Sequence, residues 1–241
     1  MQKVGDEAYI TYTPNVFSSW NYSSAYVTVH SGTTAVNATV VSTASMYIYS
    51  GGSASSVTLS GGYLSISGGV ASETTVSSGG NMRVSSGGTA MYTQLQGGTM
   101  LVVEGSASGT VFSGGYITLQ NAQVSSLTLS NSSSFLSVSS GGTAIRTNIT
   151  GGWNGVYSGG ITISATLNSG GRQNVSAGGI TTASIIEANG RQNVSSGGTA
   201  YSTTVSSGGS LVVVSGGTAL SVTSKTGAVI NSAAGAVITY A

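Results

Sequence analysis

Short runs of alternating apolar and polar residues recur along the chain, and corners that contain glycine separate them. Examples of these runs are VTLS, LSIS and YITLQ. A period of two places successive side chains on opposite faces of a strand, so these runs predict β-strands. No run follows the helical period of 3.6, and Gly, Ser, Thr and Val are weaker helix formers than Ala. Each glycine corner is predicted to be a turn, because glycine adopts positive φ without steric cost.

The corners are regularly spaced in the last third of the chain. They begin at Gly159, Gly170, Gly178, Asn189 (in place of a first glycine), Gly197, Gly208 and Gly216, so a longer and a shorter interval alternate. Each pair of intervals adds up to a repeat of about 19 residues. A flexible linker has no reason to keep such a spacing, whereas a solenoid does.

A unit of this length is too short for the four strands of a propeller blade. It fits one coil of a solenoid in which each strand pairs with its equivalent in the next coil. The pattern therefore predicts an all-β fold, a single-stranded parallel β-helix with coils of about 19 residues.

Stacked coils also predict a register. Ile186 is expected to lie over Val205, and Val194 over Val213, in columns that form the core. Outside the core, equivalent Ser, Thr and Asn side chains are expected to form ladders that share hydrogen bonds.

Residues 1–30 differ from the rest of the chain. They contain the only proline, Pro14, together with Trp20 and several tyrosines. A solenoid needs its first coil covered, because an open strand edge recruits other chains. We therefore predict an N-terminal cap at residues 1–30 and a parallel β-helix domain at residues 31–241.

Charge and composition exclude several classes of partner. Only 5% of the residues are charged, the net charge is +1 and there is no cysteine. No basic cluster is present to attract nucleic acid or an anionic membrane surface. The absence of cysteine excludes disulfides and thiolate metal sites. No run approaches the roughly 18 apolar residues of a membrane helix, so no membrane insertion is expected from this segment.

The unit V-S-S-G-G-T-A occurs intact at Val84–Ala90, Val138–Ala144 and Val194–Ala200. It recurs with small changes at Val76, Val175 and Val205. Over roughly residues 31–241 this repeat resembles that of the AIDA-type self-associating autotransporter adhesins. The resemblance implies a right-handed parallel β-helix passenger on the bacterial cell surface. It also implies homotypic association between copies, with autoaggregation and biofilm formation.

The same resemblance implies O-glycosylation of repeat serines by a dedicated heptosyltransferase. The matching serines are Ser77, Ser78, Ser85, Ser86, Ser139, Ser140, Ser195, Ser196, Ser206 and Ser207. The chain departs from the family pattern because it shows neither an export signal nor a C-terminal membrane barrel. We therefore expect an excised passenger segment, with a stand-alone relative as the alternative.

A second motif, GRQNVS, occurs twice, at Gly171–Ser176 and Gly190–Ser195. The two copies are one repeat apart, so Arg172 is expected to lie directly beside Arg191. Two interpretations stay open: exposed arginines that flank amide ladders, or a contact for an anion or a glycan, since arginine forks suit carboxylates and sulfates. Trp153 follows a glycine corner and has two similar interpretations, a packed surface ring or a sugar platform.

Enzymatic chemistry on a β-helix needs paired carboxylates or a basic residue near a metal. The only acidic residues are Asp6, Glu7, Glu73, Glu104 and Glu187, and the last three fall at different phases of the repeat. The single histidine, His30, is expected to be a surface or cap contact. We therefore predict no enzyme, no catalytic residue, no cofactor and no metal site.

Three alternatives remain open. The first is a carbohydrate-binding or carbohydrate-processing β-helix such as a phage tailspike segment. The second is an ice-binding solenoid, although a regular Thr-x-Thr row is absent. The third is a scaffold whose attached glycans make the contact with a host cell or another ligand.

Overall fold

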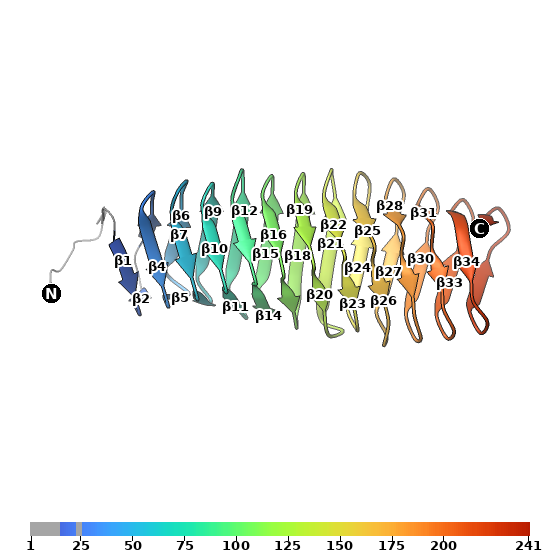
Figure 1. Ribbon diagram of the computed structural model, residues 1–241, viewed down its shortest axis with the longest axis horizontal. Helices are drawn as coiled ribbons and strands as arrows, with labels where there is room; N and C mark the ends of the chain where they lie inside the picture. Colours follow the sequence, from blue (N-terminus) through green and yellow to red (C-terminus); the bar gives the residue numbers. More distant parts are fainter. Residues whose placement is uncertain (1–14, 23–25) are drawn as a thin grey trace. The chain divides into compact units, whose positions relative to one another are not determined.

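The computed structural model describes residues 15–22 and 26–241, and none of these residues is helical. The chain forms two compact units, Met1–Thr110 and Val111–Ala241. Within each unit every strand pairs in parallel with its equivalents in the neighbouring coils (Figure 1). The predicted all-β parallel solenoid is therefore confirmed.

Each coil contributes one strand to each of three faces, which we name A, B and C in chain order. In the first unit, face A contains β1 (Asn15–Ser18), β4 (Thr33–Val36), β7 (Ser53–Ser55), β10 (Val70–Ser72), β13 (Thr89–Met91) and β16 (Ser106–Ser108). Face B contains β2 (Asn21–Tyr22), β5 (Thr39–Val41), β8 (Thr58–Ser60), β11 (Thr75–Ser77) and β14 (Gln94–Gln96). Face C contains β3 (Tyr26–Val29), β6 (Ser45–Ile48), β9 (Tyr63–Ser67), β12 (Asn81–Ser85) and β15 (Thr99–Val103).

The second unit has the same three faces. Face A contains β19 (Gln123–Ser125), β22 (Thr143–Ile145), β25 (Ile161–Ile163), β28 (Ile180–Thr182), β31 (Thr199–Tyr201), β34 (Thr218–Ser224), which continues into face B, and β36 (Val237–Tyr240). Face B contains β17 (Val111–Phe112), β20 (Thr128–Leu129), β23 (Asn148–Ile149), β26 (Thr166–Leu167), β29 (Ile185–Ile186) and β32 (Thr204–Val205). Face C contains β18 (Gly115–Gln120), β21 (Ser134–Ser139), β24 (Trp153–Val156), β27 (Arg172–Val175), β30 (Arg191–Val194), β33 (Ser210–Val213) and β35 (Val229–Ser232).

Each coil turns three times, once more than the glycine spacing indicates. The corner between faces A and B is made by one residue in the left-handed conformation, such as Arg146 (φ 53°), Ala183 (φ 55°) or Ser202 (φ 51°). The longer interval between glycine corners therefore contains faces A and B with this corner between them, and the shorter interval contains face C. Because this corner is usually not glycine, composition does not reveal it.

The two glycines of a corner meet different structural requirements. Gly170 has φ +97°, and a Cβ added there would meet no atom within 4 Å. A Cβ added at Gly171 would lie 1.9 Å from the carbonyl oxygen of Ile149 in the preceding coil. One coil later Asn189 takes the place of the first glycine at φ 63°, and Gly190 keeps the second. The first position needs positive φ, and the second needs the absence of a side chain.

The core consists of columns of inward-facing side chains, as the register predicted. In the second unit Ile186 pairs with Val205, and Val194 pairs with Val213. These four side chains are fully buried. The alternation of inward and outward residues along each strand explains this arrangement, since one residue of shift would expose the whole column.

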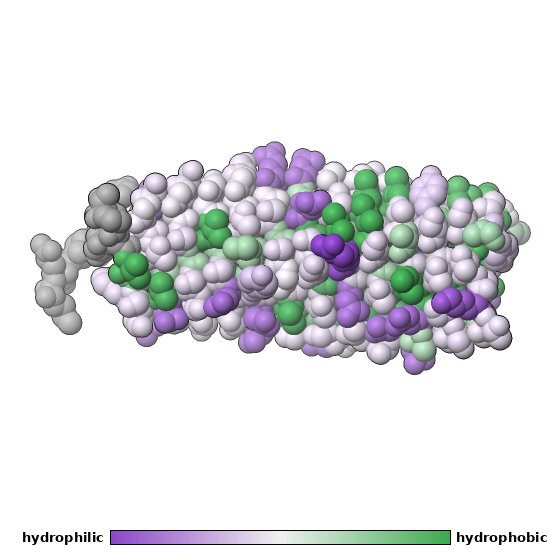
Figure 2. Space-filling view, viewed as in Figure 1, coloured by the Kyte–Doolittle hydropathy of each residue, from purple (hydrophilic) through white to green (hydrophobic). Residues whose placement is uncertain are grey.

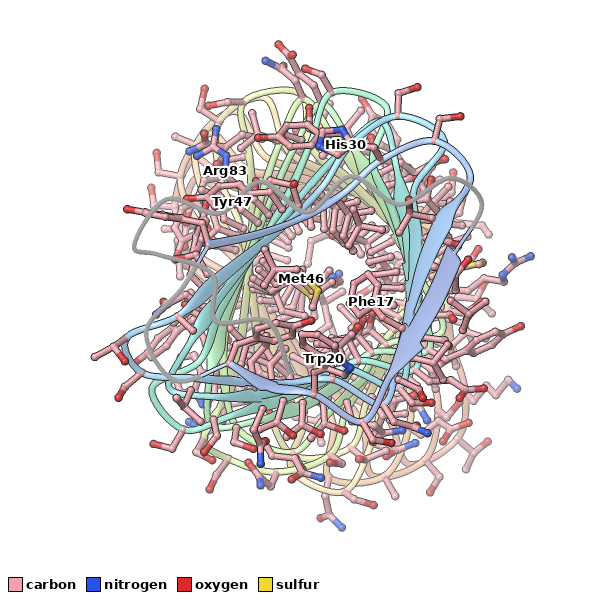
Figure 3. All side chains as sticks on the ribbon, turned by 90° about the vertical axis from the view of Figure 1, so that its left-hand side faces the viewer. Phe17, Trp20, His30, Met46, Tyr47 and Arg83 are labelled. Carbon is pink, nitrogen blue, oxygen red and sulfur yellow. The ribbon has the colours of Figure 1, made fainter. Side chains whose placement is uncertain are left out.

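Large and small residues occupy the inward positions of different faces in the first unit. Face C supplies the column Met46, Leu64, Met82 and Met100. Face A supplies alanines at the matching inward positions of β4, β7, β10, β13 and β16. Figure 3 shows Met46 and Phe17 pointing into this interior, with His30, Tyr47 and Arg83 on the outside. Large side chains opposite small ones fill a narrow coil without voids.

Polar side chains replace part of the apolar core in the second unit. Asn154, Gln173 and Gln192 share one inward column of face C, between Leu136 and Leu211. All three are buried. These residues form a column of amides where the neighbouring coils have leucine.

The amide column is well paired at Gln192. Gln192 Nε2 donates a hydrogen bond to Gln173 Oε1 at 2.7 Å and another to Thr181 Oγ1 at 3.1 Å. Thr203 Oγ1 in turn donates to Gln192 Oε1 at 3.3 Å. Neither amide atom of Asn154 has a hydrogen-bond partner among the described residues. The paired Gln192 therefore stabilises the fold, whereas the unpaired Asn154 destabilises it, because an unpaired buried amide is costly.

Leucine substitutions are expected to separate these two contributions. Gln192→Leu should lower the free energy of unfolding by about 2 kcal/mol, because it removes the buried hydrogen bonds of Gln192 with Gln173, Thr181 and Thr203. Asn154→Leu should raise it by about 1 kcal/mol, since it removes two unpaired buried groups. Urea unfolding of both variants measures the difference, and each substitution serves as the volume control for the other. Equal destabilisation by both would contradict the assignment.

The predicted N-terminal cap at residues 1–30 stays a prediction. Residues 1–14 and 23–25 lie outside the described residues. From Asn15 onward β1, β2 and β3 pair in register with β4, β5 and β6 of the following coil. The described part of this segment therefore has the same strand pairing as the coils that follow.

Candidate functional site

An outward-facing row crosses face C of the second unit. Tyr116, Phe135, Trp153, Arg172 and Arg191 are direct neighbours on the successive strands β18, β21, β24, β27 and β30. We name these five residues the aromatic–arginine row. The predicted position of Arg172 directly beside Arg191 is thereby confirmed by the strand register. Trp153 is the first residue of β24 and lies directly after a glycine corner.

Two neighbouring pairs of the row are in side-chain contact. The rings of Tyr116 and Phe135 lie 5.9 Å apart between centroids. The guanidinium carbon of Arg172 lies 5.2 Å from the centroid of the Trp153 ring, which is a cation–π contact. Tyr116 is 60% exposed and Trp153 is 37% exposed. Both rings are therefore accessible to a ligand.

The adjacent column supports the row. Arg191 Nε donates to Asn193 Oδ1 at 2.8 Å, and Asn193 Nδ2 donates to Asn174 Oδ1 at 2.8 Å. In the same column Gly155 has no side chain, and a Cβ there would lie 2.6 Å from Tyr157 Oη. The Tyr157 ring therefore lies against the backbone of β24, and Arg191 is held by an amide ladder.

The row carries two positive charges without compensation. No ion pair involves Arg172 or Arg191 among the described residues, and neither has a carboxylate partner there. The only acidic residue of the second unit is Glu187, whose Oε2 accepts a hydrogen bond from Asn168 Nδ2 at 3.3 Å. The site is therefore cationic at one end and aromatic at the other.

The predicted glycosylation serines fall into two classes. In each V-S-S-G-G unit the first serine ends or directly follows a strand, and the second lies in the corner. The first serines are half-buried: Ser77, Ser85, Ser139, Ser195 and Ser206. The second serines are exposed: Ser78, Ser86, Ser140, Ser196 and Ser207. For example, Ser85 Oγ donates to the carbonyl oxygen of Ile66, whereas Ser86 Oγ donates to the exposed Glu104 carboxylate.

A second aromatic group, on the outside of face C in the first unit, was not predicted. It consists of Tyr26, His30, Tyr47, Tyr49 and Tyr63. The rings of His30 and Tyr49 stack with 4.9 Å between centroids, and Tyr47 contacts three of these tyrosines. His30 is thus a surface contact, as expected. The position of Tyr49 one repeat after His30 was the available sequence signal.

An apolar patch lies on the outside of face A in the second unit. Ile145 pairs with Ile163, and Ile161 pairs with Ile180, on β22, β25 and β28. We name these four residues the isoleucine patch. Each of them is half-buried although it points away from the core. Figure 2 shows hydrophobic residues gathered over these strands.

The acidic residues are not brought together. Glu73 lies at a corner between faces A and B, Glu104 at a corner between C and A, and Glu187 at a corner between B and C. Within residues 15–22 and 26–241, no group of three or more His, Cys, Asp or Glu side chains could hold a metal ion. Asp6 and Glu7 lie outside the described residues. No helix in the described part of the chain is long and apolar enough to span a membrane.

The chain is similar to known proteins in sequence and in structure. Residues 60–115 match the family described as "Adhesin of bacterial autotransporter system, probable stalk". The comparison with curated proteins found no match. The crystal structure of a TibA fragment hyper-glycosylated by TibC is similar over 92% of this chain and 100% of that fragment, with 32% identity and a TM-score of 0.74.

The two matches agree with the repeat and with the parallel solenoid that the strands form. The 32% sequence identity to the TibA fragment extends over 92% of this chain. The chain therefore belongs to the AIDA-type family of autotransporter adhesins, as a β-solenoid adhesin passenger.

Proposed function

We propose that this adhesin passenger acts in homotypic self-association on the bacterial cell surface, where it promotes autoaggregation and biofilm formation. The isoleucine patch is the observation that carries the proposal. Four isoleucines point outward on a face whose strands carry no charged residue in the second unit. The four side chains are partly exposed, and a contiguous apolar patch on a protein surface commonly marks a site of interaction.

A second copy of the chain is the partner that fits this patch. The strands β22, β25 and β28 pair in continuous register, and the outward residues near the patch are mostly Thr, Ser and Ile. A net charge of +1 provides little repulsion between copies. Many weak contacts between two arrays act together, so their combined strength can exceed that of any single contact. The role is structural, with no catalytic step.

Sedimentation velocity over a wide range of protein concentration tests the self-association. The wild-type mass should rise with concentration, and the double variant Ile163→Lys/Ile180→Lys should remain monomeric, since two lysines cannot be buried against a second copy without partners. Thr128→Lys/Thr166→Lys places the same charges on the outside of face B as a control and should behave as wild type. If the isoleucine variant associates as strongly as wild type, the patch is not the contact.

Glycosylation is the second part of the proposal. The TibA fragment is hyper-glycosylated by TibC, and its similarity to this chain supports a glycosyltransferase, of the heptosyltransferase class, as a partner here. Sugars on this chain would lie at corners and leave the strands free to pair. They would add a contact for host-cell or glycan ligands on the same passenger.

The exposed serine of each unit is expected to be the acceptor. After co-expression with the heptosyltransferase, peptide mass mapping should find sugar on Ser196 and Ser207 in preference to Ser195 and Ser206. The reason is access, because a half-buried hydroxyl at the end of a strand cannot enter a transferase site. Ser196→Ala should remove the sugar from its peptide and Ser195→Ala should not. Equal occupancy of both positions would contradict this expectation.

A further inference from the structure

The aromatic–arginine row differs in chemistry from the surface around it. Outward positions of face C in the second unit are mostly Ser, Thr, Asn and Gly, whereas this row contains three aromatic rings followed by two arginines. Aromatic side chains with exposed faces bind the apolar C–H faces of sugar rings. A guanidinium binds carboxylates through two parallel hydrogen bonds.

The charge of the row is unfavourable in the free protein. Arg172 and Arg191 are direct cross-strand neighbours, and like charges directly opposite one another in a sheet destabilise it. The other ladders of this surface avoid this cost, as the neutral pair Asn174 and Asn193 does. No carboxylate of the described residues forms an ion pair with either arginine, so an anionic ligand would reduce the repulsion.

The side chains of the row are also held in place before any ligand binds. Arg172 stacks against Trp153, and Arg191 donates to Asn193. Ordering these long side chains in advance reduces the entropy that binding must overcome. Arg172 is exposed, and a cation–π contact does not use up its N–H donors, so it can still bind a carboxylate.

We propose that the aromatic–arginine row binds an acidic oligosaccharide, a chain of sugars that carries carboxylates as in polyuronates. Sugar rings stack on Tyr116, Phe135 and Trp153, and carboxylates pair with Arg172 and Arg191. Neighbouring strands are about 4.8 Å apart, so the five residues span about 19 Å. This spacing is close to the length of one sugar ring, so a linear oligosaccharide follows the row with one ring for each side chain.

Isothermal titration calorimetry with tetragalacturonate tests the proposal, with neutral cellotetraose as the matched probe. The acidic tetramer should bind, the neutral one should bind at least tenfold more weakly, and added salt should weaken the acidic one. Arg191→Gln should weaken binding about tenfold, because it removes a hydrogen bond to a charged group. Tyr116→Ser, at an exposed position, should weaken binding of both tetramers.

Arg146→Gln is the control, since Arg146 is exposed at the corner between faces A and B and the change in charge is the same. It should leave tetragalacturonate binding unchanged. Equal loss in Arg146→Gln and Arg191→Gln, equal affinity for both tetramers, or no binding of the acidic tetramer would overturn the proposal. Sedimentation velocity on Arg191→Gln should show wild-type self-association. If association is lost instead, the row contacts a second copy and does not bind the glycan.

Discussion

Val205→Asp is expected to unfold the coil around β32 and to destabilise the second unit by about 4 kcal/mol, because a carboxylate would be buried without a partner. Val205 is fully buried and packs beneath Ile186 in a column of the same unit. In a solenoid each coil depends mainly on its neighbours, so the loss should be concentrated locally. Thermal unfolding followed by circular dichroism, with hydrogen exchange of the backbone amides, measures both effects.

The neighbouring strand offers a matched control. Ile185 is 42% exposed on the outside of β29, next to the buried Ile186. Ile185→Asp introduces the same charge and should change the free energy of unfolding by no more than about 0.5 kcal/mol. If Val205→Asp keeps the wild-type melting temperature, Val205 does not belong to the core and the register is wrong.

Gly171→Ala is expected to cost about 3 kcal/mol, because one methyl group would overlap the carbonyl oxygen of Ile149 and push two coils apart. A Cβ at this position would lie 1.9 Å from that oxygen, and backbone cannot move aside as a flexible side chain can. The displaced coils would also lose backbone hydrogen bonds to one another, such as that from Arg172 N to Gly152 O, now 3.0 Å long. Urea unfolding of the variant measures the loss.

Gly170→Asn serves as the comparison within the same corner. It has open space for a side chain, and Asn189 already adopts φ 63° at the equivalent position one coil later. Asparagine is tolerated in the left-handed region, so this variant should lose less than about 1 kcal/mol. A larger loss in Gly170→Asn than in Gly171→Ala would reverse the roles assigned to the two glycines.

The two surfaces of the second unit are expected to act independently. The isoleucine patch lies on face A, and the aromatic–arginine row lies on face C. Substitutions in one face leave the core columns and the outward residues of the other unchanged. Variants of the patch should therefore keep oligosaccharide binding, and variants of the row should keep self-association.

The sequence by itself determined the class of fold, the coil length and the register. A side-chain period of two indicates strands, and the constant interval between equivalent corners in the last third of the chain can be kept only if each coil there repeats the previous one. The same interval placed Ile186 over Val205 and Arg172 beside Arg191, and both pairs are present. These features follow from spacing, which the order of the residues records directly.

Only the tertiary structure decided how the coil turns and which side chains meet across it. The corner between faces A and B uses residues as different as Arg146 and Ala183, because its requirement is a backbone angle and not a residue type. The need for Gly171 arises from a carbonyl of the preceding coil. The row that joins Tyr116 to Arg191 runs across five strands. The coils between Tyr116 and Arg191 differ slightly in length. Which of their outward residues are neighbours therefore becomes visible only when the coils are stacked.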